Sequence, residues 1–172
     1  MKNNPDDDSL ATAYEKMLER AVARFHSAEE KTGQLLHKWI DEARDKAIEL
    51  KELSEEDAEK LSLYLKRDLS DAANYLSETG NELKDWLGFE TLLMEGLFFE
   101  QLFKAANKTT LELLQIQEYT QQAAVYTTGE IMGLGTLACD QCDEKLHFHK
   151  AGRIPPCPKC HTTTFHRDIA SS

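Results

Sequence analysis

Four cysteines, the only ones in this 172-residue chain, stand in two Cys-x-x-Cys pairs. The first pair is Cys139 and Cys142, and the second is Cys157 and Cys160. A Cys-x-x-Cys turn folds back on itself and aims two sulfurs at one point. The 14 residues between the pairs are enough for two short strands and a turn. The spacing therefore predicts that four thiols meet at one place.

Four thiolates satisfy the tetrahedral preference of Zn²⁺ and leave no open position for water or substrate. We therefore predict one structural zinc ion per chain. Rubredoxin-type iron uses the same ligands and stays open as an alternative. A redox-active Cys-x-x-Cys is a further alternative, although no βαβ pattern surrounds either pair. The unit has no large core of its own, so we expect it to fold only with the metal bound.

Histidines lie close to the cysteines in the sequence. His147 and His149 fall on one face of a predicted strand, and His161 and His166 lie nearby. They could form a second metal site, but strand histidines are more often plain surface residues, and we expect the latter. His161 directly follows Cys160, at a position that often needs a positive φ angle, which His tolerates at some cost.

The sequence changes character at about Tyr126. Glycine and proline become frequent, at Gly129, Gly133, Gly135, Gly152, Pro155, Pro156 and Pro158. The stretches LHFH and TTTFH alternate apolar and polar residues as strands do. We expect a small zinc ribbon over 126–168, followed by a disordered tail at 169–172.

The preceding sequence has a helical pattern. Apolar residues recur in steps of three and four, and Gly33 is the one interruption by glycine or proline. This spacing predicts one long helix from about 9 to 52, bent at Gly33, where glycine costs about 1 kcal/mol relative to alanine. Ser9 is the expected N-cap of this helix, after a disordered N-terminus at 1–8.

A turn and a second long helix are expected next. Ser54 and Asp57 form an S-x-x-D capping box, which predicts a turn near 51–57. Two long amphipathic helices joined by a short turn are expected to pair as an antiparallel, coiled-coil-like hairpin. The helical domain is expected over 9–125, with a further helix at about 109–123. The predicted fold class is mainly α, a long helical hairpin or bundle followed by a small C-terminal β ribbon.

The negative charge is concentrated on the predicted helices. The net charge is −11; residues 1–130 carry 15 Lys/Arg and 27 Asp/Glu, and residues 131–172 carry 5 and 4. The two parts thus have net charges of −12 and +1. A surface that repels phosphate argues against broad nucleic-acid binding. It suits a basic protein partner or simple solubility.

The chain carries no recognisable targeting or membrane segment. Its first residues, MKNNPDDDS, are polar and acidic, which argues against a signal peptide. The most apolar stretch, 86–103, contains Glu90, Glu95 and Glu100, and steps of five distribute these around a helix. We expect no transmembrane span. The cytoplasm is the expected location, and there paired cysteines bind metal more often than they form disulfides.

No sequence pattern of a catalytic site is present. The chain has no P-loop, and Gly129, Gly133 and Gly135 lead into a predicted strand instead of the helix that a dinucleotide fingerprint requires. A rubrerythrin-like di-iron protein would need Glu-x-x-His on two helices, and neither His26 nor His37 has a glutamate three residues before it. We therefore predict no catalytic residue and no enzymatic activity.

Three stretches, GEIMGLGTLACDQC (129–142), PPCPKCH (155–161) and FHR (165–167), resemble the YbeL-like family of bacterial zinc-ribbon proteins. KRDLSDAA (66–73) matches more loosely. The resemblance implies a helical N-terminal region and a C-terminal ribbon in a cytoplasmic protein, and it implies no reaction. One departure is His161, where such knuckles commonly have Gly.

These features suggest two kinds of function. In the first, the protein is a non-enzymatic interaction protein whose helices bind an unknown protein partner or self-associate, with the ribbon as a second docking module. In the second, the ribbon binds nucleic acid through its basic residues, Lys145, Lys150, Arg153, Lys159 and Arg167. The acidic helices oppose the second function, because they repel phosphate.

A variant of the second function concerns the turn between the helices. Acidic residues crowd its predicted tip, at Glu52, Glu55, Glu56 and Asp57. A long hairpin with an acidic tip, together with a four-cysteine zinc unit, is similar to DksA-type factors, which insert a helical hairpin into the secondary channel of RNA polymerase. The plain interpretation is that acids in the first turn of a helix complement its dipole.

Overall fold

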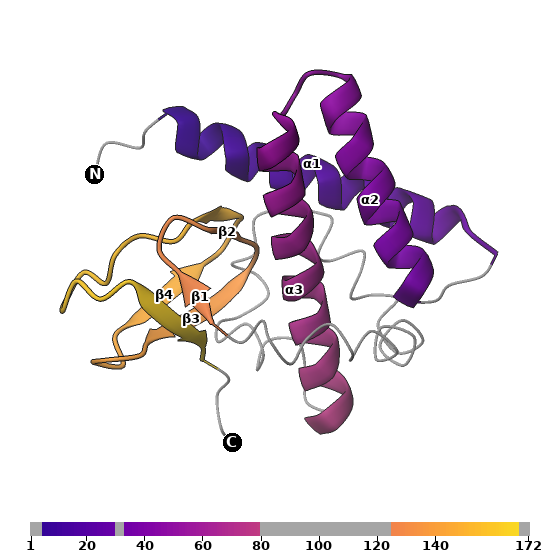
Figure 1. Ribbon diagram of the computed structural model, residues 1–172. Coiled ribbons are helices and arrows are strands. Elements are labelled where there is room, and N and C mark those ends of the chain that lie inside the picture. The colour runs from indigo at the N-terminus through magenta and orange to yellow at the C-terminus, as the bar shows by residue number, and fades with distance from the viewer. Residues whose placement is uncertain (1–4, 30–32, 80–124, 169–172) are drawn as a thin grey trace.

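The computed structural model describes residues 5–29, 33–79 and 125–168. Within these ranges, three helices precede two small antiparallel sheets (Figure 1). The helices are α1 (Pro5–Ser27), α2 (Gly33–Glu49) and α3 (Glu55–Thr79). The strands are β1 (Tyr126–Thr127), β2 (Ile131–Met132), β3 (Gly135–Cys139), β4 (Lys145–Phe148), β5 (Gly152–Arg153) and β6 (Thr164–Arg167).

The prediction of one long helix over 9–52 is wrong, because α1 and α2 are separate helices that pack against each other. The rings of Phe25 and Trp39 meet edge to face, with centroids 5.8 Å apart. In one straight helix, residues this far apart in sequence would lie about 21 Å from each other. The chain therefore reverses between α1 and α2, so that both aromatic residues are buried at the same seam.

The predicted turn at 51–57 is confirmed. Helix α2 ends at Glu49, and Lys51 adopts a left-handed conformation with φ of 57°. The amides of Glu52 and Lys51 donate to the carbonyls of Ala47 and Ile48, as in a Schellman motif. Ser54 then caps α3, since its Oγ accepts from the Asp57 amide at 3.1 Å and donates to the Asp57 carboxylate at 2.9 Å.

The ends of the predicted helical domain differ from expectation. Helix α1 begins at Pro5, so the N-terminus expected to be disordered is helical from this residue on, and Ser9 lies inside the helix. Proline suits the first turn of a helix, where its missing N–H has no partner to lose. The predicted helix at 109–123 and the predicted tail at 169–172 lie outside the described residues. None of the described helices is long and apolar enough to cross a bilayer.

The strands form one four-stranded and one two-stranded antiparallel sheet. The larger has the order β1-β6-β3-β4, and the smaller pairs β2 with β5. All of these strands lie within the range expected for the ribbon. The larger sheet packs around the cysteines, in a cluster that includes Tyr126, Leu137 and Phe165.

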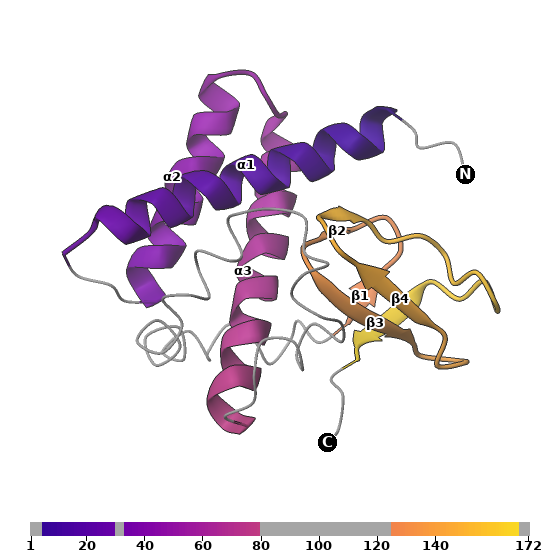
Figure 2. The same ribbon diagram turned by 180° about the vertical axis from the view of Figure 1, so that it is seen from behind.

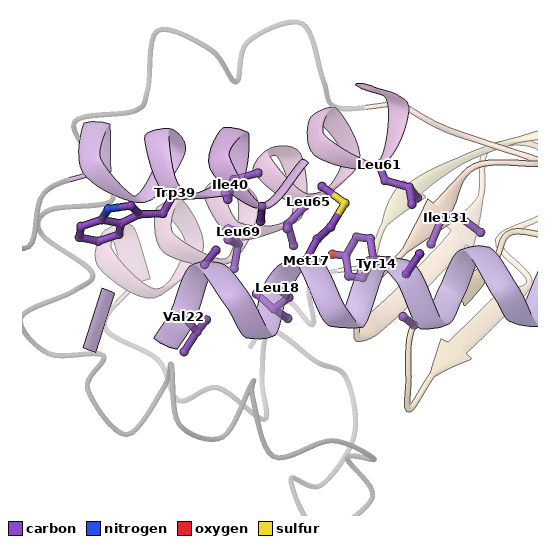
Figure 3. Packing of buried hydrophobic residues seen from close by; sticks show 14 of the residues in the cluster. Tyr14, Met17, Leu18, Val22, Trp39, Ile40, Leu61, Leu65, Leu69 and Ile131 are labelled. Carbon is purple, nitrogen blue, oxygen red and sulfur yellow. The ribbon is translucent and has the colours of Figure 1, made fainter. Parts of the chain in front are cut away.

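The ribbon is not a separate unit after the helices, because it packs on them. Figures 1 and 2 show it on one side of α3, with α2 on the other side. Ile131, Leu134 and Ala151 of the ribbon belong to the same buried cluster as Tyr14 and Leu61 of the helices. Figure 3 shows Ile131 at the end of this cluster, next to Tyr14 and Leu61. Helices and ribbon therefore share one core.

Candidate metal centre

The four cysteines come together as the sequence predicts. Their Sγ atoms all lie within 4.8 Å of one another. The distance is 3.4 Å between Cys139 and Cys160, and 3.6 Å between Cys142 and Cys157. A tetrahedron with Zn–S bonds of about 2.3 Å has S···S edges of about 3.8 Å. These separations fit a four-thiolate zinc site and are far longer than a disulfide bond of about 2.0 Å.

The two Cys-x-x-Cys turns have the same backbone hydrogen bonds. In the first turn, the Asp143 amide donates to the carbonyl of Cys139, whose own amide donates to the carbonyl of Glu144. In the second, His161 and Thr162 take the same positions around Cys157. These four bonds are 2.9–3.0 Å long. The two turns are thus equivalent knuckles that present their sulfurs to one point.

The residue after each pair has a left-handed backbone. The φ angle is 58° at Asp143 and 63° at His161. The expected positive φ at His161 is therefore confirmed, and the sequence analysis missed the matching position in the first knuckle. Aspartate and histidine are both among the residues that adopt this conformation more often than others do, at some cost relative to glycine.

Amide donors around the sulfurs favour the thiolate form that a metal requires. Hydrogen bonds from the side chain and amide of Thr162 lower the pKa of the Cys160 thiol to about 6. Burial opposes ionisation of Cys157, but the amides of Cys160 and Lys159 lower the pKa of this thiol overall. The Gln141 amide donates to Cys139 Sγ at 3.4 Å. Both knuckles therefore direct backbone dipoles at their sulfurs.

Cys142 shows why the centre needs a cation. Although the Glu144 amide lowers the pKa of its thiol, burial and the three neighbouring sulfurs raise this pKa to about 12. Four thiolates without a metal repel one another, and a divalent cation among them removes this repulsion. The residues present thus fit a bound Zn²⁺, with Cys139, Cys142, Cys157 and Cys160 as its ligands.

The histidines near the cysteines do not gather at a second metal site. His147 Nδ1 lies 2.8 Å from the Thr136 hydroxyl, and His166 Nδ1 lies 2.7 Å from the Asp140 carboxylate. The four cysteines are the one group of three or more potential metal ligands that meet among the residues the structure describes. His147, His161 and His166 are exposed, as expected for surface residues, whereas His149 is partly buried.

A cluster of charged residues between α3 and the ribbon was not predicted from the sequence. We call it the interface cluster, and it consists of Arg67, Asp68, Asp71, Tyr126, Glu130 and Arg167. Arg67 is 9% exposed, Asp68 is 0% exposed and Arg167 is 7% exposed. Buried charges are costly unless they are paired and hydrogen-bonded, so each must have its partners in this interface.

Asp68 is the acceptor at the centre of the interface cluster. Its Oδ2 accepts from the Tyr14 hydroxyl at 2.7 Å and from the Gly133 amide at 2.9 Å. Its Oδ1 lies 3.2 Å from Arg67 Nε and 3.6 Å from Arg167 Nη2. Burial, and then the Asp68 carboxylate, raise the pKa of Tyr14, so the hydroxyl stays a donor. One carboxylate thus joins α1, α3 and the ribbon.

The two arginines cross the interface in opposite directions. Arg67 of α3 donates to Glu130 of the ribbon at 2.6 Å, and its guanidinium stacks 4.0 Å from the ring centre of Tyr126. Arg167 of β6 pairs with Asp71 of α3 and donates to the Tyr126 hydroxyl at 3.1–3.2 Å. Each side of the interface therefore contributes one arginine: Arg67 of α3 binds the ribbon, and Arg167 of the ribbon binds α3.

The sequence contained a signal for this cluster. Asp68 follows Leu61 and Leu65 in steps of four and three, so it stands on the apolar stripe of its helix. A charge on such a stripe indicates a buried partner. The cluster also coincides with the stretches that resemble the YbeL-like family, since KRDLSDAA contributes Arg67, Asp68 and Asp71, and FHR contributes Arg167.

The basic residues considered for nucleic-acid binding are partly engaged within the protein. Arg167 is buried in the interface cluster, and Lys145 pairs with Asp168 at 2.7 Å. Arg153 donates to the Gly129 carbonyl at 2.8 Å. The expected set of five cations therefore does not form one free basic surface.

The acids of the predicted hairpin tip also have partners. Glu52 receives two hydrogen bonds from Arg20, at 2.8 and 2.9 Å. Glu56 pairs with Lys60 at 2.6 Å, and Asp57 belongs to the cap of α3. The positions of these three acids agree with the plain interpretation, in which they pair locally or complement the start of a helix.

Comparison with known proteins agrees with this geometry. The sequence model of a family described as "Zinc-ribbon containing domain" matches residues 23–169. The chain belongs to this family. The match covers α2, α3 and the whole ribbon, so the family unit includes both sides of the interface cluster. As a zinc-ribbon containing domain protein, the chain carries one structural zinc at its four cysteines.

The family's curated relatives include "Uncharacterized protein YbeL" from Escherichia coli K12 and the same protein from the O157:H7 strain. Each is 27% identical over 160 residues, which cover 93% of this chain and 96% of the relative. The expected YbeL-like resemblance is therefore confirmed over nearly the full length. No solved structure matches the chain.

Proposed function

We propose that this zinc-ribbon protein is a non-enzymatic, cytoplasmic protein-interaction module. The observation that carries the proposal is the closed metal centre. Its four ligands are thiols that both knuckles direct to one point, so the metal has no open position for water or substrate. A metal bound in this way stabilises the fold of the ribbon, and a stably folded surface can bind a protein partner.

The groove between α1 and α2 is the surface we propose for a protein partner. It has a volume of about 610 Å³ and is lined by Ala23, Trp39 and Ala43, together with Arg20, Arg24 and Lys46. Each cation pairs with a glutamate, Arg20 with Glu52, Arg24 with Glu42 and Lys46 with Glu49, and a carboxylate of a partner can compete for these cations. The groove therefore suits a partner segment that presents an apolar side chain flanked by carboxylates.

The existing ion pairs of the groove leave room for such a partner. Arg24 pairs with Glu42 at 2.9 Å, and their side chains are 64% and 41% exposed. Exposed pairs of this kind contribute about 0–1 kcal/mol. A carboxylate of the partner can therefore replace Glu42 at little cost, while burial of the partner's apolar side chain in the groove supplies the free energy of binding.

Affinity capture with a matched pair of variants tests this function. Ala23→Arg places a long charged side chain in the groove, whereas Thr12→Arg adds the same charge at another exposed position of α1. We expect a partner captured from the native cell by the wild type and by Thr12→Arg, and lost with Ala23→Arg. Direct binding of the identified partner to the purified protein must show the same pattern.

Two results would overturn the proposal. One is a partner whose binding is equal for Ala23→Arg and the wild type, because the groove would then not be the surface. The other is a purified protein that turns over a metabolite with no stable partner, because it would then be an enzyme.

A further inference from the structure

The interface cluster has no role in the groove between α1 and α2, because it lies on the other side of α3. It joins the metal-bearing ribbon to the helices by charged groups, of which Arg67, Asp68 and Arg167 are almost wholly buried. Replacing a buried ion pair by apolar residues is often neutral or stabilising. Stability alone therefore does not explain why this interface is charged.

A short path of contacts connects the metal centre to α3. Cys139 on β3 is paired in register with Phe165 on β6, and the fully buried Phe165 packs in the cysteine cluster. Arg167 follows Phe165 by two residues and points to the same face of β6. It reaches Asp68 and Asp71 of α3. The strand that packs on the thiols thus also carries the arginine that holds the helix.

The ribbon has little to hold it together without the metal. Its strands are two to five residues long. Two cysteines, Cys139 and Cys157, are among the fully buried residues of its cluster. Loss of the metal leaves four thiols that repel one another when ionised, so the pairing of Cys139 with Phe165 weakens. Arg167 then loses the strand that positions it.

The apolar face of the helices becomes exposed when the ribbon undocks. Ile131, Leu134 and Ala151 no longer shield Tyr14 and Leu61. Asp68 loses the Gly133 amide and Arg167, and keeps Tyr14 and Arg67. Arg67 in turn loses Glu130. A charged interface therefore opens more readily than an apolar one, because its groups regain hydration when they are exposed.

We propose that the interface cluster makes docking of the ribbon on α1 and α3 depend on the metal. With zinc bound the ribbon is docked; without zinc it is released, and one face of the helices is exposed. Coupling between two equilibria is reciprocal. Residues of α3 that touch no cysteine must therefore affect how firmly the ribbon retains its zinc. This inference does not depend on any partner protein.

The first test measures zinc release from the full-length protein to an excess of chelator. Asp71→Asn removes the charge that pairs with Arg167 and keeps the size of the side chain. Asp45→Asn makes the same change at an exposed pair on α2 and is the matched control. We expect release at least tenfold faster from Asp71→Asn, and the wild-type rate from Asp45→Asn. Asp68→Ala provides a second, stronger variant.

The second test measures amide hydrogen exchange with and without chelator. We expect removal of zinc to reduce protection in the part of α3 that faces the ribbon, 61–68, while protection of α2 over 36–47 persists. The zinc-loaded Asp71→Asn variant should show a smaller loss of protection in the same part of α3.

Three outcomes would overturn the proposal. Zinc release at the wild-type rate from both Asp71→Asn and Asp68→Ala would show that the helix does not affect the metal. Unchanged exchange in α3 after zinc removal would show that the ribbon stays docked. Equal loss of protection in α2 and α3 would show global unfolding instead of release of the ribbon.

Discussion

Gly135 allows the interface cluster to form because it has no side chain. Its φ angle is 139°, a conformation that other residues rarely adopt. A Cβ atom at this position would lie 1.9 Å from Arg167 Nη1. Arg167 Nη1 donates to the carbonyl of Leu134, the residue just before Gly135, at 3.0 Å. The guanidinium thus occupies the space that a side chain would take.

We predict that Gly135→Ala destabilises the protein by about 2–4 kcal/mol, because it combines backbone strain with displacement of a buried arginine. The control is Gly129→Ala. Gly129 also has a positive φ, of 96°, but nothing lies within 4 Å of the added Cβ atom. Gly129→Ala should therefore destabilise the protein by only about 1 kcal/mol. Urea unfolding of the zinc-loaded proteins measures both values, and equal costs would contradict the role of Arg167.

His37 makes stability depend on pH. Burial, and then the positive charge of Lys66, lower the pKa of this half-buried side chain to about 4, and Asp41 offsets this only in part. The unfolded chain, with a pKa of about 6.5, binds the proton first as the pH falls. Stability is therefore complete above about pH 6.5 and is lost between there and about pH 4.

We predict that His37→Gln reduces the loss of stability between pH 7 and pH 5 by about 1 kcal/mol, a value that allows for the partial exposure of His37. Denaturant unfolding at the two pH values measures the difference. Thr12→Gln is the control, since Thr12 is an exposed side chain without a titratable group and its replacement should leave the pH dependence as in the wild type. A similar change in both variants would mean that His37 is not the cause.

At the residue scale, the sequence predicted the cysteines in full, whereas for the interface cluster it contained only the signal of Asp68. Cys139 and its three partners follow a spacing that has one main structural use. Arg67 looks like a surface charge of a helix, and so does Asp68 unless its place on the apolar stripe is noticed. Their ribbon partners, Glu130 and Arg167, are distant in sequence, and no local pattern indicates such a pairing.

At the scale of elements, the repeat of apolar residues concealed the break between α1 and α2. Phe25 and Trp39 stand in phase with each other, so a continuous helix fits the pattern as well as two helices do. Both helices bury this face against a common core, and the periodicity therefore continues across the turn. The turn before α3 was predictable because Ser54 and Asp57 form a local signal.

The end of α2 offers a stabilising substitution. Lys51 has a φ angle of 57° at the position where helices usually place glycine. We predict that Lys51→Gly stabilises the protein by about 0.5–1 kcal/mol, because it removes the strain of a left-handed lysine. Lys38→Gly, at an exposed position inside α2, should instead destabilise it by about 1 kcal/mol. Thermal unfolding measures both, and destabilisation by Lys51→Gly would contradict the strain.

At the scale of the whole molecule, the metal content gives a direct test. We predict a colourless protein with one zinc per chain, in which thiol reagents react slowly until a chelator is added and then modify four thiols. Cys157→Ser should lose the zinc, since it removes one of four ligands. Elemental analysis and thiol titration measure these quantities. Bound iron would give a coloured protein and contradict the assignment.

For the whole molecule, the helical region and the ribbon could be predicted from the sequence, but the packing of one on the other could not. A helical region followed by a ribbon agrees with the sequence analysis. The docking of the ribbon was missed, because Ile131 and Leu134 resemble ordinary strand residues and their contacts with Tyr14 span most of the chain. Contacts of such long range leave no periodic pattern in the sequence.

The position of Asp68 has a consequence for synthesis on the ribosome. Its partners are Tyr14, made well before it, and Gly133 and Arg167, made long after it. While the ribbon is still in the exit tunnel, the Asp68 carboxylate lacks its partners from the ribbon, and the apolar face of α3 is not yet covered by ribbon residues. The nascent helices are thus exposed to aggregation and to proteases until β6 emerges and the four cysteines bind their metal. Supply of zinc to the new chain therefore sets when this period ends.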